Sequence, residues 1–329
     1  MLLPLTYGQS LLALSLAALL WGTWANMQKL DRKWRFELYA FDFAVGALLL
    51  ALLSAMTLGN SGTSASFTFE DSLTVGSKRN MALAIGAGIV YFIGHMMILA
   101  GLALAGMSTA MPVAAGITLA VCVALGASLA NPTLAYCGVA AGLAAVVASA
   151  LAQKAAAPAG GKVLYDGWKG FILSAIGGLI VAASLPIAES TRAGDIGIGS
   201  YAVTLFMTLG LLLMTPLVNI YFLNLPVQGA PMSPRAYLKG TRKQHLQGIA
   251  GGALWAGGTV AFFAALGGAY RGAPSMLSII AFAFGGAVVA GICGLTIWRE
   301  HADTPKAKMM LWVSLLLLAA AAALIFLGT

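Results

Sequence analysis

The sequence predicts an all-α integral membrane protein whose ten transmembrane helices form two groups of five, arranged as an inverted-topology repeat. Of the 329 residues, 60% are hydrophobic and 9% are charged, whereas soluble domains carry about 25% charged residues. Most of the 40 glycines lie inside apolar runs, and they lack the G-X-Y period of collagen. Glycines in such runs are typical of close-packed membrane helices. The composition therefore excludes a soluble globular domain.

Ten apolar runs are long enough to cross a membrane, which takes roughly 20 apolar residues per helix. They lie near residues 7–28, 36–58, 80–104, 108–129, 132–152, 168–190, 200–223, 246–267, 273–295 and 308–327. No Asp, Glu, Lys or Arg occurs between Asn80 and Gln153, so we expect three spans joined by short turns there. The first run has no basic segment before it, which favours a retained helix over a cleaved signal peptide.

A flexible linker with the sequence KAAAPAGG, at residues 154–161, lies at the middle of the chain. We therefore expect a first five-helix repeat at residues 1–153, a linker at 154–167 and a second five-helix repeat at 168–329. The segment GIVY at 88–91 aligns with GALW at 252–255. Because each half has an odd number of spans, the second half is inserted upside down relative to the first.

The basic residues predict the orientation in the membrane. Loops on the cytoplasmic side of membrane proteins are enriched in Lys and Arg. Most Lys and Arg residues of this chain fall on one side of the predicted spans. They are Lys29, Arg32, Lys33, Arg35, Lys154, Lys162, Lys169, Arg235, Lys239, Arg242, Lys243, Arg299, Lys306 and Lys308. The other side has only Lys78, Arg79, Arg192 and Arg271. We expect a multi-pass protein of the plasma (cytoplasmic or inner) membrane with both termini outside the cytoplasm.

Asp42 lies in the second apolar run, between Phe41 and Phe43. A carboxylate facing lipid is costly, so this side chain lies either near the interface or towards a cavity. A carboxyl group held in an apolar helix is a plausible proton carrier in a coupled transporter. The structural alternative is an ion pair with Arg35 or Lys33.

Further candidate residues combine polar atoms with aromatic rings. Trp21, Thr23, Trp24 and Asn26 end the first run. They form either a stacking wall with hydrogen-bond partners for a polar solute or an interfacial anchor. His95 is the sole ionisable side chain in the charge-free middle of the first half; it either binds a solute or proton, or fixes helix packing.

Tyr91, Trp255 and Thr259 lie deeper in their runs than an interfacial aromatic belt requires. They are therefore candidates for a solute cavity, with helix packing as the competing interpretation. Glu189 and Arg192 are three positions apart at the end of the sixth run. An i,i+3 ion pair explains them economically, and gating is the functional alternative.

Several function classes lack their motifs. The chain has no phosphate-binding G-x-x-x-x-G-K-[ST] loop, no H-E-x-x-H and no G-x-S-x-G. Its three cysteines have no zinc or disulfide spacing, and its basic residues form no single patch for nucleic acid. We therefore expect no cofactor, no metal and no nucleic-acid partner, and we disfavour a membrane-embedded enzyme.

The sequence resembles the drug/metabolite transporter superfamily, and within it the branch of ureide permeases and glucose/ribose or rhamnose-type sugar porters. The resemblance rests on LLWGTWANMQKL at 19–30, YAFDFAVG at 39–46, IGHMMILAGLALAGMSTAMPVAAGITL at 93–119 and GGALWAGGTVAFFAALGGAY at 251–270. It implies the drug/metabolite transporter fold and carries the roles of Trp24, Asp42 and Trp255 over to this chain. The plant proteins have a polar amide where this chain has His95, so the resemblance does not carry the plant substrate over to this chain.

The resemblance further implies a proton-coupled secondary transporter that moves ureides, nucleobases or sugars by alternating access. A multidrug or amphipathic metabolite exporter of the same superfamily is the alternative. Ten spans complete a cavity within one chain, so we expect a monomer in the lipid bilayer, with a dimer as the alternative.

Overall fold

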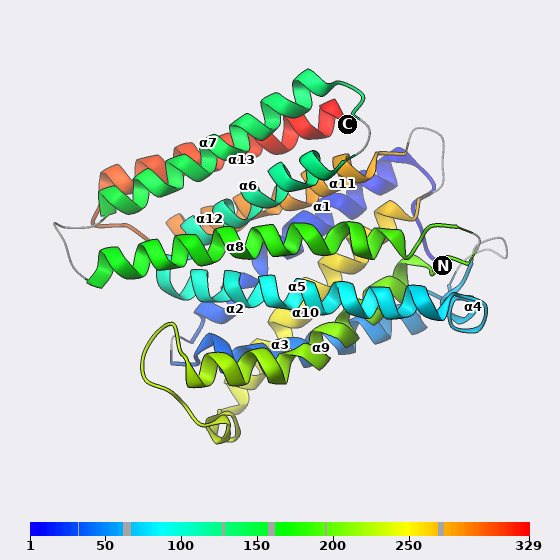
Figure 1. Ribbon diagram of the computed structural model, residues 1–329, viewed down its shortest axis with the longest axis horizontal. Helices are drawn as coiled ribbons and strands as arrows, with labels where there is room; N and C mark the ends of the chain where they lie inside the picture. Colours follow the sequence, from blue (N-terminus) through cyan, green and yellow to red (C-terminus); the bar gives the residue numbers. More distant parts are fainter. Residues whose placement is uncertain (32, 62–66, 127–128, 157–161, 195, 269–272) are drawn as a thin grey trace. The chain divides into compact units, whose positions relative to one another are not determined.

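The computed structural model describes residues 1–31, 33–61, 67–126, 129–156, 162–194, 196–268 and 273–329. Within these ranges the protein is all-helical and has no strand (Figure 1). The helices are α1 (Tyr7–Thr23), α2 (Ala25–Lys29), α3 (Phe36–Met56), α4 (Phe69–Thr74), α5 (Lys78–Ala105), α6 (Met107–Leu125), α7 (Pro132–Ala156), α8 (Lys162–Ser190), α9 (Ser200–Asn224), the 3₁₀ helix η1 (Pro234–Lys239), α10 (Arg242–Leu266), α11 (Met276–Phe284), α12 (Gly286–Thr296) and α13 (Pro305–Gly328).

Ten segments of the described chain are long and apolar enough to cross a membrane, which confirms the predicted number of spans. The first span consists of α1 and α2, and the ninth consists of α11 and α12. Helices suit this environment because all their backbone hydrogen bonds form within the segment, where lipid offers no partner. The protein is therefore a multi-pass integral membrane protein.

The middle of the chain is more helical than a linker at 154–167 would suggest. Helix α7 continues to Ala156, and α8 begins at Lys162. The intervening part of the predicted linker, residues 157–161, lies outside the described residues.

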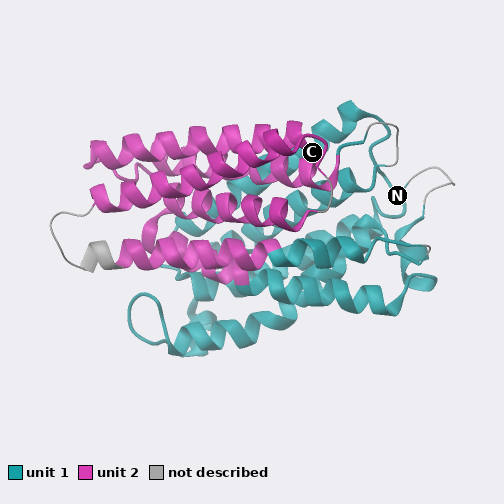
Figure 2. Ribbon diagram, turned by 45° about the horizontal axis from the view of Figure 1, so that its top comes forward, with its two compact units in different colours: residues 1–93, 183–274 teal, residues 94–182, 275–329 magenta. Residues whose placement is uncertain are grey.

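The helices form two compact units, and each unit takes helices from both halves of the sequence (Figure 2). Unit 1 comprises residues 1–93 and 183–274, and unit 2 comprises residues 94–182 and 275–329. Helices α5 and α8 contribute one part to each unit. The packing inside each unit therefore depends on contacts between segments that are far apart in the sequence.

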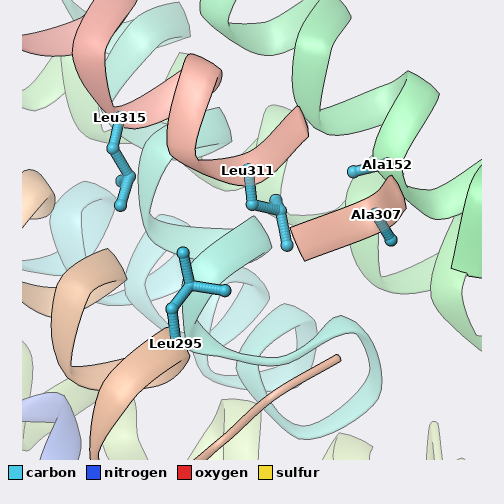
Figure 3. Packing of buried hydrophobic residues seen from close by; sticks show 5 residues of the cluster. All are labelled: Ala152, Leu295, Ala307, Leu311 and Leu315. Atoms are coloured by element: carbon cyan, nitrogen blue, oxygen red, sulfur yellow. The ribbon is translucent and has the colours of Figure 1, made fainter. Parts of the chain in front are cut away.

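Unit 2 contains an apolar core between α7, α12 and α13, with α7 and α13 side by side (Figure 1). Its buried members are Ala152, Leu295, Ala307, Leu311 and Leu315 (Figure 3). Lipid tails are as apolar as leucine, so close van der Waals packing holds these helices together.

The beginning of α6, also in unit 2, is capped by a distant carboxylate. The two carboxylate oxygens of Glu300 accept hydrogen bonds from the backbone N–H groups of Met107, at 2.9 Å, and Ser108, at 2.8 Å. Gly106, directly before the helix, has a φ of 83°, a conformation that favours glycine. Glu300 therefore supplies the acceptors that the first turn of α6 lacks.

In unit 1, glycines bring α10 directly against α3. A Cβ atom at Gly46 would overlap the backbone of Ile249, and a Cβ atom at Gly252 would overlap the backbone of Phe43. Small residues at both contacts allow the two helix backbones to approach closely.

Helices α5 and α9 approach each other in the same way, also in unit 1. A Cβ atom at Gly88 would overlap the backbone of Met207, and a Cβ atom at Gly210 would overlap the backbone of Ile85. Glycine is therefore required on both sides of this contact too.

Candidate functional site

Four of the predicted solute-binding residues meet in unit 1 around Trp255 of α10. Trp255 is 2% exposed, and its indole Nε1 donates a hydrogen bond of 2.6 Å to the hydroxyl oxygen of Tyr91 on α5. The centroids of the two rings are 4.9 Å apart. Each ring combines a large apolar face with one polar atom, so the pair offers both a stacking surface and hydrogen-bonding groups.

Trp21 of α1 joins this pair to a hydroxyl group. Its Nε1 lies 3.2 Å from the carbonyl oxygen of Trp255 and 3.3 Å from Oγ1 of Thr259, and it donates to both. The Thr259 hydroxyl in turn donates to the carbonyl oxygen of Trp255 at 2.9 Å. Trp21 also stacks on Phe262, with ring centroids 5.2 Å apart. Trp21, Tyr91, Trp255 and Thr259 are called the aromatic cluster below.

The other three residues predicted near the end of the first span lie where α1 ends and α2 begins. Trp24 is 3% exposed and meets Phe43 edge-on, with ring centroids 5.6 Å apart. The Thr23 hydroxyl donates to the carbonyl oxygen of Leu19 at 2.8 Å, and Nδ2 of Asn26 donates to that of Thr23 at 3.0 Å. Both hydrogen bonds stay within this segment of the chain, and the solute-binding role of Thr23, Trp24 and Asn26 stays a prediction.

Asp42, the predicted proton-coupling residue, lies near the beginning of α3 and is 2% exposed. The hydroxyl of Tyr237, on η1, donates to its Oδ1 at 2.5 Å. Nδ1 of His245, on α10, lies 3.0 Å from each of its two carboxylate oxygens. Asp42, Tyr237 and His245 are called the carboxylate cluster below.

The basic residue closest before α3 has different partners. Nη2 of Arg35 lies 2.5 Å from Oε1 of Glu37, whose side chain is 0% exposed. Nη1 of Arg35 donates to the carbonyl oxygen of Ala230 at 2.7 Å. Arg35 therefore compensates the buried Glu37 charge, whereas the carboxylate of Asp42 is bonded by Tyr237 and His245.

Local packing explains why these three side chains meet. A Cβ atom at Gly248, one turn after His245, would come within 3.2 Å of Cγ of Asp42, so glycine lets α10 lie close to the carboxylate. The ring of Trp34 packs on His245 and Tyr237, with centroids 5.2 and 6.1 Å apart. The loop before α3 and the loop before α10 thus enclose the carboxylate cluster together.

The chemistry of the carboxylate cluster suits reversible proton binding. Burial raises the pKa of the Tyr237 phenol above its usual 10.0, and the Asp42 carboxylate that accepts its hydrogen bond raises it further. Tyr237 therefore remains a donor at physiological pH. The imidazole of His245 and the carboxylate of Asp42 can each bind a proton, and Nδ1 lies 3.0 Å from both carboxylate oxygens, so one proton can be shared between the two groups.

Sequence reasoning did not single out Tyr237 and His245 as partners of Asp42. They lie 195 and 203 positions after it in the sequence. The available signal was indirect: a buried carboxylate needs a hydrogen-bonding partner, and the polar stretch before the eighth span contains a tyrosine and a histidine.

The remaining predicted residues lie at two other places. His95 is 1% exposed, on the part of α5 that belongs to unit 2. The predicted i,i+3 ion pair is present in unit 1, where Nη1 of Arg192 lies 2.8 Å from Oε2 of Glu189. Nη2 of Arg192 also donates to the carbonyl oxygen of Leu266 at 2.8 Å, which ties the end of α8 to the end of α10.

Neither cluster contains a set of metal ligands. Across the described ranges, no group of three or more His, Cys, Asp or Glu side chains is placed to hold a metal ion. The carboxylate cluster has two groups of the kind that bind metals, Asp42 and His245, and these two groups are hydrogen-bonded to each other.

No family model and no curated protein matches this chain. Among solved structures, the chains that match include one described as the crystal structure of a protein, with a TM-score of 0.58. It is 15% identical, and the match covers 98% of this chain and 98% of that chain. At this identity the likeness shows a shared fold and nothing about function.

Proposed function

We propose that the ten spans form a 5+5 inverted repeat of the drug/metabolite transporter type. The glycine contacts of unit 1 support this, because a single offset of 164 positions relates the α3–α10 contacts to the α5–α9 contacts. The pairs separated by this offset are Gly46 and Gly210, Ile85 and Ile249, Phe43 and Met207, and Gly88 and Gly252.

Tyr91 and Trp255 are separated by the same 164 positions, and they hydrogen-bond to each other. Two equivalent residues of an inverted repeat meet only close to the pseudo-two-fold axis that relates the halves. Substrate sites of transporters with such repeats lie near the middle of the membrane at the interface of the repeats. The position of the aromatic cluster therefore favours a solute-binding role.

The protein that we propose is a secondary active transporter, proton-coupled, for small polar metabolites such as ureides, nucleobases or sugars. The observation that carries this proposal is the carboxylate cluster, an acidic side chain in a membrane-spanning helix with Tyr237 and His245 as its partners. Ionisable groups within membrane spans are rare and mark proton relays and solute pathways.

In the proposed cycle, protonation of Asp42 allows the carrier to reorient, and loss of the proton on the cytoplasmic side promotes release of the solute. The aromatic cluster, together with Thr23, Trp24 and Asn26 of unit 1, binds the solute, and the Glu189–Arg192 ion pair acts in gating. His95 is proposed as a separate solute-binding residue of unit 2. The bias of Lys and Arg among the loops supports a plasma-membrane protein whose termini both lie outside the cytoplasm.

Uptake into proteoliposomes tests the coupling. A panel of radiolabelled uracil, allantoin, ribose and glucose is offered with and without an imposed proton gradient. We expect Asp42→Asn to abolish gradient-driven accumulation while exchange of internal for external solute continues. Asp71→Asn, which changes a carboxylate outside the spans, serves as the control. Unchanged uphill uptake by Asp42→Asn would refute the coupling role.

A second candidate function, export of amphipathic metabolites, is favoured by an open apolar pocket of about 550 Å³ on the surface of unit 1. Cavities of this size suit small-molecule ligands. Its walls include Leu5, Leu16, Leu20, Leu58, Val260 and Ala264. Competition distinguishes the two candidates: lipophilic cations should block an amphipathic exporter and leave a polar-solute carrier unaffected.

A further inference from the structure

Helix α9 in unit 1 carries a polar stripe that is buried along its whole length. The stripe consists of Ser200, Thr204, Thr208, Thr215 and Asn219, each at most 3% exposed. Successive members are four or seven positions apart, which keeps them within about 100° of the helix circumference. A membrane-spanning helix thus presents hydroxyl and carboxamide groups on a face turned away from lipid.

The threonines of the α9 stripe satisfy their own donors within the helix. Their Oγ1 atoms donate to backbone carbonyl oxygens, Thr204 to Ser200 at 3.2 Å, Thr208 to Leu205 at 2.8 Å and Thr215 to Leu211 at 2.8 Å. A hydroxyl oxygen has two lone pairs and remains an acceptor after it donates. Each threonine can therefore still accept a hydrogen bond from a group that moves past it.

Asn219 ends the stripe and is 0% exposed. Neither its Oδ1 nor its Nδ2 has a hydrogen-bond partner among the residues that the structure describes. Three positions later, Phe222 meets Phe36 of α3 edge-on, with ring centroids 5.6 Å apart, so this part of α9 faces protein. A buried carboxamide is rarely left without partners. The donor Nδ2 and the acceptor Oδ1 of Asn219 therefore fit a ligand that binds here transiently.

The corresponding face of α3 shows that packing does not require polar residues. The positions 164 earlier than the stripe are Phe36, Ala40, Ala44, Ala51 and Ala55, all of them buried. If the stripe served only to let helices approach, alanine would serve equally well on α9, as it does on α3. The polar atoms of α9 therefore have a purpose beyond packing.

We propose that the α9 stripe is a binding track for an uncharged polar solute, and that Asn219 is its terminal binding residue. This inference rests on the proposed transport function and names a part of the solute site that lies outside the two clusters. The solute is uncharged because the stripe has no Lys, Arg, Asp or Glu, and a charged solute in an apolar bundle needs a counter-charge. It offers donors to the threonine oxygens and both a donor and an acceptor to Asn219.

Ligand-induced thermal stabilisation separates this role from a structural one. The ligand is the member of the uracil, allantoin, ribose and glucose panel that stabilises the purified wild-type protein most. For Asn219→Leu we expect unchanged or higher thermal stability without ligand and at least about a tenfold loss of affinity. Gln153→Leu is the matched control, because the Gln153 carboxamide is buried but donates to Thr109 at 2.7 Å. It should lower the thermal stability and keep the affinity. A lower stability of Asn219→Leu with unchanged affinity would overturn the inference.

Cysteine accessibility provides a readout that does not depend on transport. In a background without Cys122, Cys137 and Cys293, the variants Thr208→Cys and Thr215→Cys are compared with their counterparts on α3, Ala44→Cys and Ala51→Cys. We expect a membrane-impermeant thiol reagent to label the α9 positions at least about tenfold faster, because a solute track is wet during the cycle. Bound solute should slow this labelling.

The two experiments distinguish failure of the inference from failure of the proposed function. Suppose that the wild-type protein transports a panel solute, but the cysteines on α9 and α3 are labelled equally slowly. This result would overturn the solute track and leave the proposed transport function in place. Absence of saturable uptake of every panel solute by the wild-type protein would overturn the proposed function and the solute track with it.

Discussion

The α3–α10 contact and the α5–α9 contact share one backbone design but carry different side chains. Both depend on glycines that meet the backbone of the opposite helix, at positions 164 apart. Around the first contact lie Asp42, Tyr237 and His245. The positions 164 earlier or later are occupied by Phe206, Leu73 and Met81, which have no ionisable group.

This difference suggests that the scaffold is repeated and the chemistry is not. Backbone approach depends only on small residues and tolerates any side chains beyond the contact. Of the positions compared, only those at the α3–α10 contact carry ionisable groups, which suits the proton coupling proposed for this cluster.

The largest effect is expected from leucine at the repeated glycines. Gly88→Leu and Gly252→Leu should each destabilise the protein by about 3 kcal/mol or more, because the new side chain would overlap the backbone of a neighbouring helix. Thermal unfolding in detergent measures both losses. Gly86→Leu is the control, since a Cβ atom there meets nothing within 4 Å. A large loss at only one of the two contacts would break the equivalence.

A carboxylate transplanted to the second contact tests the chemical difference. Phe206→Asp should destabilise the protein by about 2.5 to 3.5 kcal/mol, because neither Leu73 nor Met81 can bond an acidic group as Tyr237 and His245 do. Asparagine has a shape similar to that of aspartate but no charge, so Phe206→Asn should lose clearly less stability than Phe206→Asp in the same unfolding measurement. Equal losses would mean that the contact tolerates charge without a dedicated cluster.

Sequence reasoning predicts the spans of this protein well because lipid imposes a strong local rule. Each span must be a long apolar helix, and that requirement is visible within 20 or so residues. Tyr91 and Trp255 could also be selected as candidate residues because of their depth in the spans, and their role in solute binding stays a prediction. The partners of Asp42 could not be selected in this way, since Tyr237 reaches it from a loop 195 positions away. Asn219 looks unremarkable in the sequence, and its interest arises from complete burial.

Tyr237→Phe should have an intermediate effect that depends on pH. At neutral pH it removes a hydrogen bond to Asp42, which stabilises by about 1.5 to 3 kcal/mol if the carboxylate is charged. In the wild-type protein the folded state has the higher Tyr237 pKa, so the contribution of this phenol to stability is complete below pH 10.0 and decreases as the pH rises further. Between neutral and alkaline pH, the free energy of unfolding should therefore decline less steeply for Tyr237→Phe than for the wild-type protein. An unchanged slope would place the phenol outside the cluster.

Asp31→Asn should have the smallest effect, because it lies at the margin of the carboxylate cluster. The backbone N–H of Lys33 and, to a smaller extent, the side chain of Gln244 hold the pKa of Asp31 below its usual 3.8. Its contribution to stability is therefore present above pH 3.8 and is lost as the pH falls below that value. Because Asp31 is only partly buried, near the surface, we expect a loss of less than about 1 kcal/mol at neutral pH.

The side chain of Gln244 donates a hydrogen bond to Asp31, and Gln244 directly precedes His245. Asp31→Asn therefore also tests how the imidazole of His245 is positioned at the α3–α10 contact. If Asp31→Asn leaves proton-driven uptake unchanged, the position of His245 is set by α10 and Gly248 rather than by the loop before α3. A large loss of coupling with little loss of stability would instead mean that this loop orients the imidazole. The asymmetry between the contacts would then extend beyond the three residues that bond one another to the surface loop that encloses them.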